Sequence, residues 1–531
     1  MNGFNACDYQ FFILCTTTLL YVVSVGTVLL RTNGDAGTFA ADHTFRLANY
    51  FQDRMVLEAD IPGSVLWGYG KPGAEVEIEL LGDILLTGIN DEGLWKQSLW
   101  AGIPTGPWDI DVYQSERGNY TGHVVLRDVY FGDVFLCVGE ANMAFPVAKM
   151  FNASEELAAS SEFPLIRLMR ISPDSSFSAL PEPRILQNWT IATPDSLKDF
   201  SALCWATGRR VSEDIRSRFG QKAPIGLIGA YRDAASPIRG WIPPNSIGHC
   251  TGTMQQPGTD SVLWNAMIAP IKTLRFTSVI WYQGESDAAL DADTYGCLFK
   301  AMVEGWRGNF FREFFGIVQL GTRNSEDVPG ATAQIRWEQT AEYGQVPNEA
   351  LILVFMASAM DLADPESPFG SELPRYKEEI AQRLLAGIVS VLYYRHIPFQ
   401  GPFPKRIQLG PDNASLCIEY DQQINFTPNA ASNFEICCDT PIFRTDNWKD
   451  CRIWHNTTSR PSLSAGNTIV VSTPCAGNAS ASFVQYAWAV TPCGYKNCQV
   501  YATDYLGDPK GLPGPPFVLP TNWTRDDYNL V

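Results

Sequence analysis

The apolar run Val134–Val138 constrains the fold of this chain more than any other segment, because five apolar residues in succession leave no polar face. Such a run is typical of a strand that is buried on both sides of a sheet. Similar runs, with helical stretches such as 378–386 between them, occupy residues 225–228, 279–281 and 351–355. This alternation predicts a doubly wound α/β domain over residues 126–396.

The regions on either side of that domain have a different pattern. Residues 42–125 alternate apolar and polar positions in short runs separated by Pro-Gly and Gly-Asp turns, which predicts an N-terminal β-domain. Residues 397–531 combine frequent Gly and Pro with seven cysteines, which predicts a Cys-rich β segment. The Pro/Gly tail at 506–520 is predicted to lack regular structure.

A turn, Gly139–Met143, follows the first buried run directly. Hydrolases present a nucleophilic serine on such a turn at the carboxyl end of a strand, where backbone N–H groups reach the oxyanion. The centre of this turn is Ala141, and its methyl group cannot attack a carbonyl carbon. The turn therefore has the form of a nucleophile loop without the nucleophile.

Several blocks along the chain resemble the sialate O-acetylesterase family, and Trp281–Ser286 (Trp-Tyr-Gln-Gly-Glu-Ser) is the most specific of them. The other similar blocks are 45–57, 65–74, 262–268, 334–337, 367–371 and 486–498. The resemblance implies a flavodoxin-like domain of the SGNH-hydrolase type with flanking β-rich domains. It also implies an enzyme that removes acetyl groups from O-acetylated sialic acids with a Ser/His pair.

The chain differs from the family at the positions that the resemblance implies are catalytic. The resemblance assigns the serine to Ala141 and the histidine base to Leu373, and a leucine cannot take and return a proton. A small Gly-Gly-Thr turn of the family is replaced by a segment that contains Ala235. None of the five histidines stands in the family's Asp-x-x-His-Pro context. We therefore expect no catalytic residues and hydrolysis near background.

The retained polar residues of the two turns are the candidates for ligand binding: Glu140, Asn142, Gln283, Gly284, Glu285 and Ser286. The alternative is that these residues only support the fold, with neighbours satisfying their polar groups. The carboxylates of Glu140, Glu285, Asp361 and Asp364 lack His or Cys at metal-ligand spacing, so neither a metal nor another cofactor is predicted.

The formal net charge of −18 and the pI near 4.8 argue against a nucleic-acid partner, because phosphates require a basic surface. They argue equally against adhesion to anionic lipid. Membrane attachment is expected only through the N-terminus, where Phe11–Leu30 is an uncharged run within a segment, 1–41, that is either a signal peptide or a signal anchor.

Glycosylation sequons and cysteines place the rest of the chain in the secretory pathway, either secreted or in a lumenal or lysosomal compartment. The cysteines of the last quarter are expected to form disulfides, with one of the seven left over. The eight sequons begin at Asn119, Asn152, Asn188, Asn413, Asn425, Asn456, Asn478 and Asn522.

The sequence leads to one main functional hypothesis and two alternatives. The main hypothesis is a catalytically inactive pseudoesterase that binds a sialylated glycan or a protein partner. The first alternative is residual or altered ester hydrolysis with a substitute nucleophile such as Ser286. The second is a structural ectodomain whose pocket has closed around Ala141 and Leu373.

Overall fold

The computed structural model describes most of the chain after residue 43. The described ranges are 44–60, 63–250, 258–310, 314–326, 328–411, 413–427, 430, 434–439, 447–457, 459–477, 479–503 and 510–525. The expected signal peptide or anchor, 1–41, lies outside them. Within these ranges, no helix is both long enough and apolar enough to cross a membrane.

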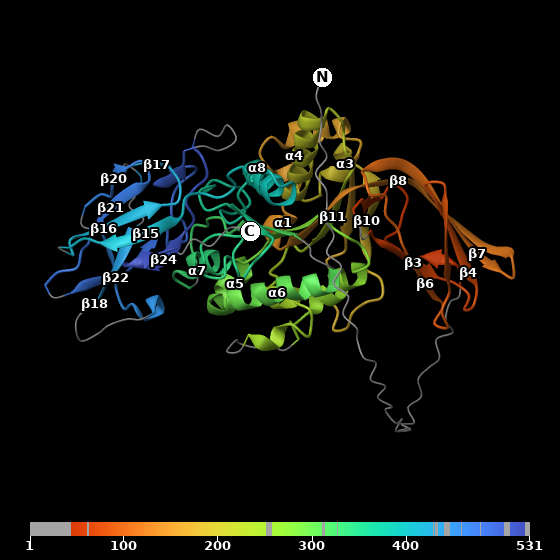
Figure 1. The fold of residues 1–531 in the computed structure, drawn as a ribbon, viewed down its shortest axis with the longest axis horizontal. Coiled ribbons are helices and arrows are strands. Elements are labelled where there is room, and N and C mark those ends of the chain that lie inside the picture. The colour runs from red at the N-terminus through yellow and green to blue at the C-terminus, as the bar shows by residue number, and fades with distance from the viewer. Residues whose placement is uncertain are drawn as a thin grey trace, which may run out of the picture. The chain divides into compact units, whose positions relative to one another are not determined.

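A parallel sheet forms the centre of the fold and confirms the predicted α/β class (Figure 1). Its parallel strands follow the order β9-β11-β8-β12-β13-β14, and β10 pairs antiparallel with β9 at one edge. The bounds are β8 (Asn119–Gly139), β9 (Ile166–Ile171), β10 (Ile185–Ile191), β11 (Ile225–Tyr231), β12 (Ser278–Tyr282), β13 (Phe314–Gln319) and β14 (Val354–Ser358). The apolar run at 351–355 was therefore placed too early as a strand, because β14 begins only at Val354.

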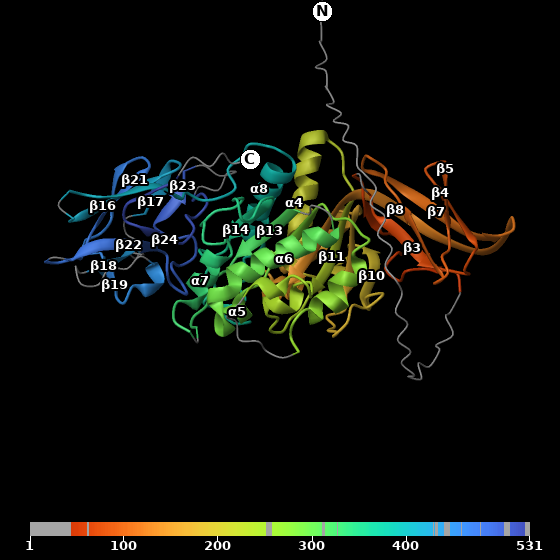
Figure 2. The same cartoon turned by 60° about the horizontal axis from the view of Figure 1, so that its bottom comes forward.

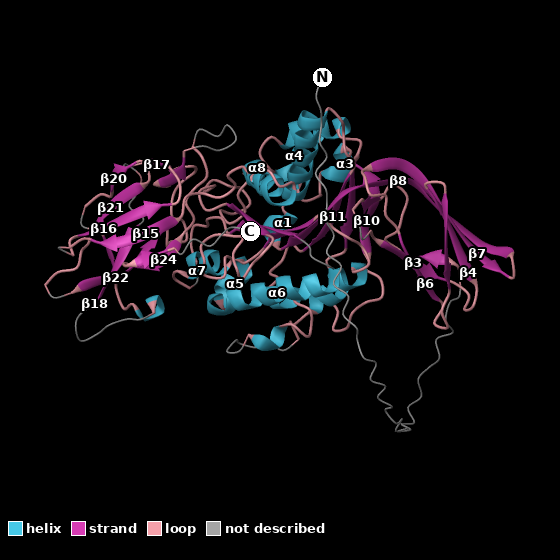
Figure 3. Cartoon of the chain, in the orientation of Figure 1, coloured by secondary structure: helices cyan, strands magenta, loops and turns pink. Residues whose placement is uncertain are grey.

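Helices cover both faces of this sheet. Figure 3 shows α4 (Ala202–Phe219) and α8 (Lys377–Gly387) on one side of the strands and α6 (Tyr295–Phe310) on the other. The shorter helices are α1 (Ala141–Ala144), α2 (Ala153–Ala159), α3 (Pro194–Leu197), α5 (Glu285–Leu290) and α7 (Ala331–Glu338). Two disulfides not anticipated from the sequence brace this domain, Cys137–Cys204 between β8 and α4 and Cys250–Cys297 at α6.

The long strand β8 joins the N-terminal β region to the central sheet (Figure 2). Its first half pairs antiparallel with β7 (Thr105–Glu116), and its last seven residues pair in parallel with β11. It therefore crosses the domain boundary expected at residues 125/126 without a break. The remaining strands here are β1 (Arg46–Leu47), β2 (Val56–Glu58), β3 (Val65–Tyr69), β4 (Glu75–Leu80), β5 (Asp83–Gly88) and β6 (Leu94–Ser98).

The C-terminal region is rich in strands, and three disulfides join its cysteines. A five-stranded sheet has the order β20-β21-β16-β15-β25, a four-stranded sheet has the order β19-β18-β22-β24, and β17 pairs with β23. Their bounds are β15 (Pro404–Leu409), β16 (Ser415–Tyr420), β17 (Ile424–Phe426), β18 (Phe434–Asp439), β19 (Trp454–Asn456), β20 (Ser462–Ala465), β21 (Thr468–Ser472), β22 (Ser480–Tyr486), β23 (Val500–Ala502), β24 (Phe517–Pro520) and β25 (Trp523–Thr524). The disulfides are Cys437–Cys451, Cys438–Cys475 and Cys493–Cys498, and the exposed Cys417 is the cysteine left over.

The tail expected to be irregular at 506–520 ends in a strand, so that expectation is wrong for its last part. Strand β24 pairs antiparallel with β22 at the edge of the four-stranded sheet. An edge strand tolerates proline because one side of its backbone needs no ladder partner. Proline therefore marks the edge here rather than the absence of a strand.

Candidate functional site

Two turns meet at the carboxyl edge of the central sheet, one after β8 and one after β12. Gly139 pairs with Tyr282, and the N–H of Glu140 donates to the Tyr282 carbonyl over 3.1 Å. A side chain on Gly139 is excluded, since a Cβ would lie 2.0 Å from that carbonyl oxygen. Close strand ends therefore bring the nucleophile-like turn beside the Gln-Gly-Glu-Ser turn, which is where open α/β sheets bind ligands.

The carboxylate of Glu140 fastens these turns together. The side chain is 2% exposed, and one oxygen accepts from the N–H groups of Gly284 and Ser286, each over 3.1 Å. The other oxygen accepts from the Ser236 N–H over 3.2 Å and from the Ser286 hydroxyl. Charge-assisted bonds of this kind are about twice as strong as neutral ones. Glu140 is therefore a crosslink among three loops.

Ala141 is the first residue of α1, and its half-buried methyl group lies immediately after this crosslink. Leu373 is half-buried and packs against the main hydrophobic core. The preceding carbonyl, that of Glu372, accepts a hydrogen bond from Asn142 over 2.8 Å. The structure thus brings Ala141 and Leu373, the positions that the resemblance assigns to the serine and the histidine, to neighbouring loops. The third, Ala235, is exposed in the loop that ends at Ser236.

The histidines whose side chains the structure describes lie outside this cluster. His123 is in the β7–β8 hairpin and contacts Asp111, His455 is in β19, and His396 follows α8. All three are exposed. None of these three imidazoles is hydrogen-bonded to the turns described above, so none replaces the missing base in the described part of the site.

Asn142 is held by two ionisable side chains. Its amide nitrogen donates to Glu285 over 2.6 Å, and its amide oxygen accepts from the ammonium group of Lys377 over 2.6 Å. Burial lowers the pKa of Lys377 to about 7, against the opposing charge of Glu285. Burial, and then the nearby charge of Glu140, raise the pKa of Glu285 to about 8.

Gln283 turns away from this cluster and holds the loop behind it. Its fully buried amide donates to Asp287 over 2.5 Å and to the Ser236 carbonyl over 3.2 Å. Its amide oxygen accepts from the Tyr295 hydroxyl over 3.1 Å. Burial is the main cause that raises the pKa of Asp287 to about 7. Gln283 supports the fold, and so does Gly284, whose φ of +140° favours glycine.

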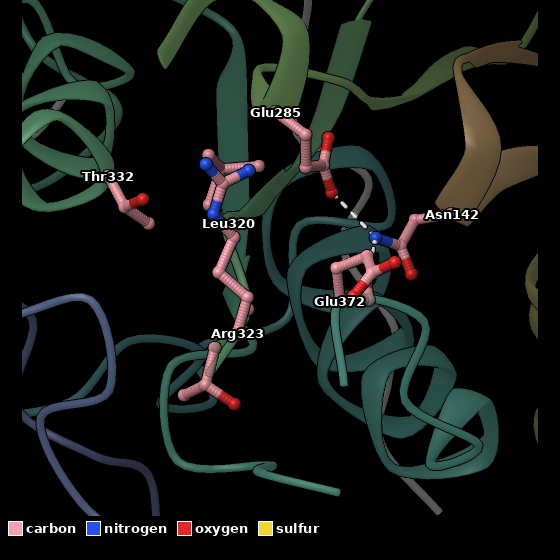
Figure 4. A pocket seen from close by; sticks show the side chains of 8 residues that line it. Asn142, Glu285, Leu320, Arg323, Thr332 and Glu372 are labelled. Carbon is pink, nitrogen blue, oxygen red and sulfur yellow. Dashed lines mark hydrogen bonds between the residues drawn. The ribbon is translucent and has the colours of Figure 1, made fainter. Parts of the chain in front are cut away.

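A small pocket opens beside Asn142 and Glu285 (Figure 4). Six of its lining residues are Asn142, Glu285, Leu320, Arg323, Thr332 and Glu372. Of the six candidate binding residues, two therefore line the pocket, while Glu140, Gln283, Gly284 and Ser286 belong to the hydrogen-bond network around it. Arg323 and Thr332 were missed, because the strand before them, β13, was not predicted.

The remaining carboxylates considered for a metal are paired elsewhere. Asp361 forms a buried ion pair with Arg383 at 2.6 Å, and Asp364 pairs with Arg375 at 2.8 Å. The described residues contain no group of three His, Cys, Asp or Glu side chains arranged to hold a metal ion.

The sequon asparagines that the structure describes are exposed: Asn119, Asn152, Asn188, Asn413, Asn425, Asn456 and Asn522. Asn478 lies outside the described residues. Exposure leaves these side chains accessible to modification.

Comparison with known proteins agrees with this architecture. The family described as carbohydrate esterase, sialic acid-specific acetylesterase matches residues 131–368, and the sialate O-acetylesterase C-terminal domain matches residues 405–521. The structure of a carbohydrate acetylesterase from Xanthomonas citri superposes with a TM-score of 0.73 at 23% identity, covering 90% of this chain and 99% of that one. The fold is therefore that of a carbohydrate esterase of the SGNH type.

Curated relatives give the family. Sialate O-acetylesterase of Homo sapiens is 35% identical over 512 residues, which are 89% of this chain and 92% of the human protein. The Mus musculus protein is 34% identical, with 89% of this chain and 94% of the mouse protein covered. The chain belongs to the sialate O-acetylesterase family.

Proposed function

We propose that this protein is a secretory-pathway glycoprotein of the sialate O-acetylesterase family that does not hydrolyse esters and acts by binding a sialylated glycan. The observation that carries the proposal is the methyl group of Ala141 at the head of α1, beside a pocket and a network of polar loops that are otherwise complete. Within this network, Asn142 and Glu285 line the pocket and remain available to a ligand there.

The chemistry of the site supports inactivity. Ester hydrolysis by this fold needs a nucleophile and a base within hydrogen-bond reach of each other. The two positions that the resemblance assigns to them are Ala141 and Leu373, and neither side chain exchanges a proton. Loss of such a pair lowers kcat by about a million-fold where it has been measured in a serine protease.

Five disulfides and the exposed sequons support an oxidising, lumenal environment. We infer that the protein is secreted or resides in a lumenal or lysosomal compartment, and that Phe11–Leu30 directs it there as a signal peptide or anchor. A protein partner, in place of a glycan, is the other ligand that this proposal admits.

The test combines hydrolysis with binding. Chain purified from a secretory host is assayed with an activated acetyl ester and with a 9-O-acetylated sialoside, and is applied to sialylated glycans beside the same glycans without sialic acid. We expect hydrolysis at the level of a heat-treated control and binding that requires sialic acid. Turnover on the order of 1 per second would refute inactivity, and equal binding to both glycan sets would refute sialic-acid recognition.

Restoration sharpens this test. Ala141→Ser alone should stay inactive, because a serine without a base remains protonated and weakly nucleophilic. Ala141→Ser combined with Leu373→His should give weak but measurable hydrolysis. Ala158→Ser, which adds a hydroxyl at an exposed position of α2, is the matched control. Full activity in the single Ala141→Ser variant would show that another residue serves as the base.

One observation favours a second candidate function, an altered hydrolase. The Ser286 hydroxyl donates to the Glu140 carboxylate, so a serine and a carboxylate are in contact at the site. Transfer of that proton would weaken the three N–H bonds by which Glu140 joins the loops, so we rank this candidate second. If hydrolysis is detected, its loss in Ser286→Ala would establish the alternative.

A further inference from the structure

Three polar atoms that line or border the pocket have no hydrogen-bond partner among the described residues. They are the second carboxyl oxygen of Glu285, the hydroxyl of Thr332 and Nε of Arg323. Thr332 is only 2% exposed, and its backbone N–H is already bonded to Glu326 over 3.0 Å. An unpaired buried polar group destabilises a fold, so three of them around one pocket are consistent with a ligand that pairs with them.

Arg323 brings a positive charge to this pocket from a fixed loop. Figure 4 shows its side chain extending into the pocket, with Thr332 on one side and Asn142 and Glu285 on the other. No ion pair joins it to a carboxylate in the described part of the chain. The fully buried Arg336 donates to the carbonyls of Leu320 and Gly321, over 2.9 and 2.6 Å, and so holds the loop that carries Arg323.

Glu285 faces several charged or titratable groups, and together these groups determine whether its carboxyl group is protonated. These groups are Glu140, Tyr282, Tyr295, Lys377, Arg323 and Glu372, and Asp287 lies behind them in contact with the charge of Glu140. Burial and the charge of Glu140 raise the pKa of Glu285 to about 8, so the carboxyl is neutral at the pH of the secretory pathway. One oxygen already accepts from Asn142. The proton therefore belongs on the other oxygen, where it makes a donor directed at the pocket.

We propose that this pocket binds the carboxylate of an acidic sugar, with Arg323 supplying the charge and with Thr332 and protonated Glu285 donating hydrogen bonds. The proposal rests on the glycan-binding function proposed above and assigns residues to it. Three donors converge here, and an anion is the group that can accept from all of them. The exposed carboxylate of Glu372 at the pocket serves as an acceptor for the hydroxyl groups of the same sugar.

The sign of the pH dependence follows from the proton on Glu285. Below pH 8 the carboxyl donates to the bound carboxylate. Above pH 8 it becomes an anion that repels the ligand. Lys377 and Asp287, whose pKa values are both about 7, also change charge in this range, so the contribution of Glu285 is the difference between wild type and Glu285→Gln. In Glu285→Gln, the amide keeps an acceptor for Asn142 and a donor for the ligand at every pH. Because one proton on Glu285 is involved, the extra loss of affinity in wild type should reach about tenfold by pH 9.

The experiment measures binding of the α-methyl glycoside of N-acetylneuraminic acid and of its carboxyl methyl ester to the full chain by titration calorimetry. We expect the acid to bind at least about tenfold more tightly than the ester. Arg323→Gln should abolish that preference, and Thr332→Val should weaken it. Arg117→Gln, which makes the same change in the exposed turn of the β7–β8 hairpin, is the matched control.

The outcomes separate this inference from the function on which it rests. Equal affinity for acid and ester, or unchanged affinity of Arg323→Gln for the acid, overturns the carboxylate subsite while glycan binding stands. An acid preference with no extra loss of affinity in wild type, relative to Glu285→Gln, up to pH 9 overturns the role of Glu285. If neither sugar binds in the millimolar range, and sialylated glycans fail as well, both the subsite and the proposed function are wrong.

Discussion

Carboxyl groups lie at both ends of the parallel sheet, and they differ in how completely they are hydrogen-bonded. At the amino end, Glu58 accepts from the Thr277 hydroxyl over 2.5 Å and from the Ala59 N–H over 3.1 Å, while Asp133 accepts from the Tyr393 hydroxyl over 2.6 Å. At the carboxyl end, Glu285 keeps one buried oxygen without a partner. Satisfied groups stabilise a fold, whereas unsatisfied ones beside a pocket indicate a ligand.

Two threonines extend the comparison. The Thr277 hydroxyl at the amino end accepts a hydrogen bond from the Val134 N–H over 2.8 Å and donates one to Glu58. It is therefore satisfied both as an acceptor and as a donor. The Thr332 hydroxyl at the carboxyl end is buried and has neither partner among the described residues. The same side chain is therefore structural at one end of the sheet and available at the other.

Removal of Glu140 should produce the largest effect, because this carboxylate is the one fully satisfied acid that we find in the candidate site. Glu140→Ala leaves the N–H groups of Gly284 and Ser286 without their acceptor, while the Ser236 N–H keeps only the Ser286 hydroxyl, 3.1 Å away. At about 1–3 kcal/mol for each unpaired group, the free energy of unfolding should fall by about 2 kcal/mol or more. Thermal unfolding of the purified variant measures this, and Glu140→Gln, which keeps one acceptor, should lose less. An unchanged melting temperature would show that the site end holds no structural carboxylate.

Glu58→Gln tests the amino end through pH. Burial, and then the charge of Asp133, raise the pKa of Glu58 to about 8, whereas an unfolded glutamate titrates near 4.3. The folded state therefore binds more protons between these values. The stability that Glu58 contributes is fully present below about pH 4.3 and is lost as the pH rises through about 8, with a slope of at most about 1.4 kcal/mol per pH unit.

The glutamine variant should flatten that dependence by one proton and should be the more stable protein at pH 8. Urea unfolding at half-unit steps between pH 4.5 and 8.5 measures the slope. Asp60, Asp133, Thr277 and Tyr393 face this carboxyl and remain in place. Asp83→Asn, at an exposed position of β5, is the control. Equal slopes in wild type and Glu58→Gln would mean that the amino-end pair is ionised in the folded state.

The sequence predicted three strands of the central sheet, β8, β11 and β12, and two of its candidate residues line the pocket. Val134–Val138 and 279–281 are buried on both faces, and continuous apolar runs reveal such strands. The predicted strand at 351–355 was placed too early because an apolar run indicates burial but does not fix the backbone conformation. Leu351 is buried, but Leu353 has a φ of +54° and cannot extend a strand.

The missed half of the site has a physical explanation as well. Asn142 and Glu285 were found because they belong to the two motif turns. Arg323 and Thr332 belong to no motif, and they reach the pocket only because β13 and α7 place them at the same edge of the sheet. The side chains that fix Asn142 come from distant segments: Glu285 is 143 residues away in the chain and Lys377 is 235 residues away. Such contacts depend on tertiary structure, so local sequence patterns do not predict them.

The threonine pair gives the smallest and sharpest test of the comparison. Valine has nearly the shape of threonine, so the substitution removes a hydroxyl and little else. Thr277→Val should lower the free energy of unfolding by about 1–3 kcal/mol, because the Val134 N–H and the Glu58 carboxyl each lose a partner. Thr332→Val should leave it unchanged or raise it by up to about 1 kcal/mol, because a buried hydroxyl without a partner is replaced by an apolar group. Urea unfolding at pH 7 in the absence of sugar compares the two variants directly. A decrease in the free energy of unfolding as large in Thr332→Val as in Thr277→Val would show that the Thr332 hydroxyl is already hydrogen-bonded in the free protein. The polar groups at the carboxyl end of the sheet would then be as fully satisfied as those at the amino end.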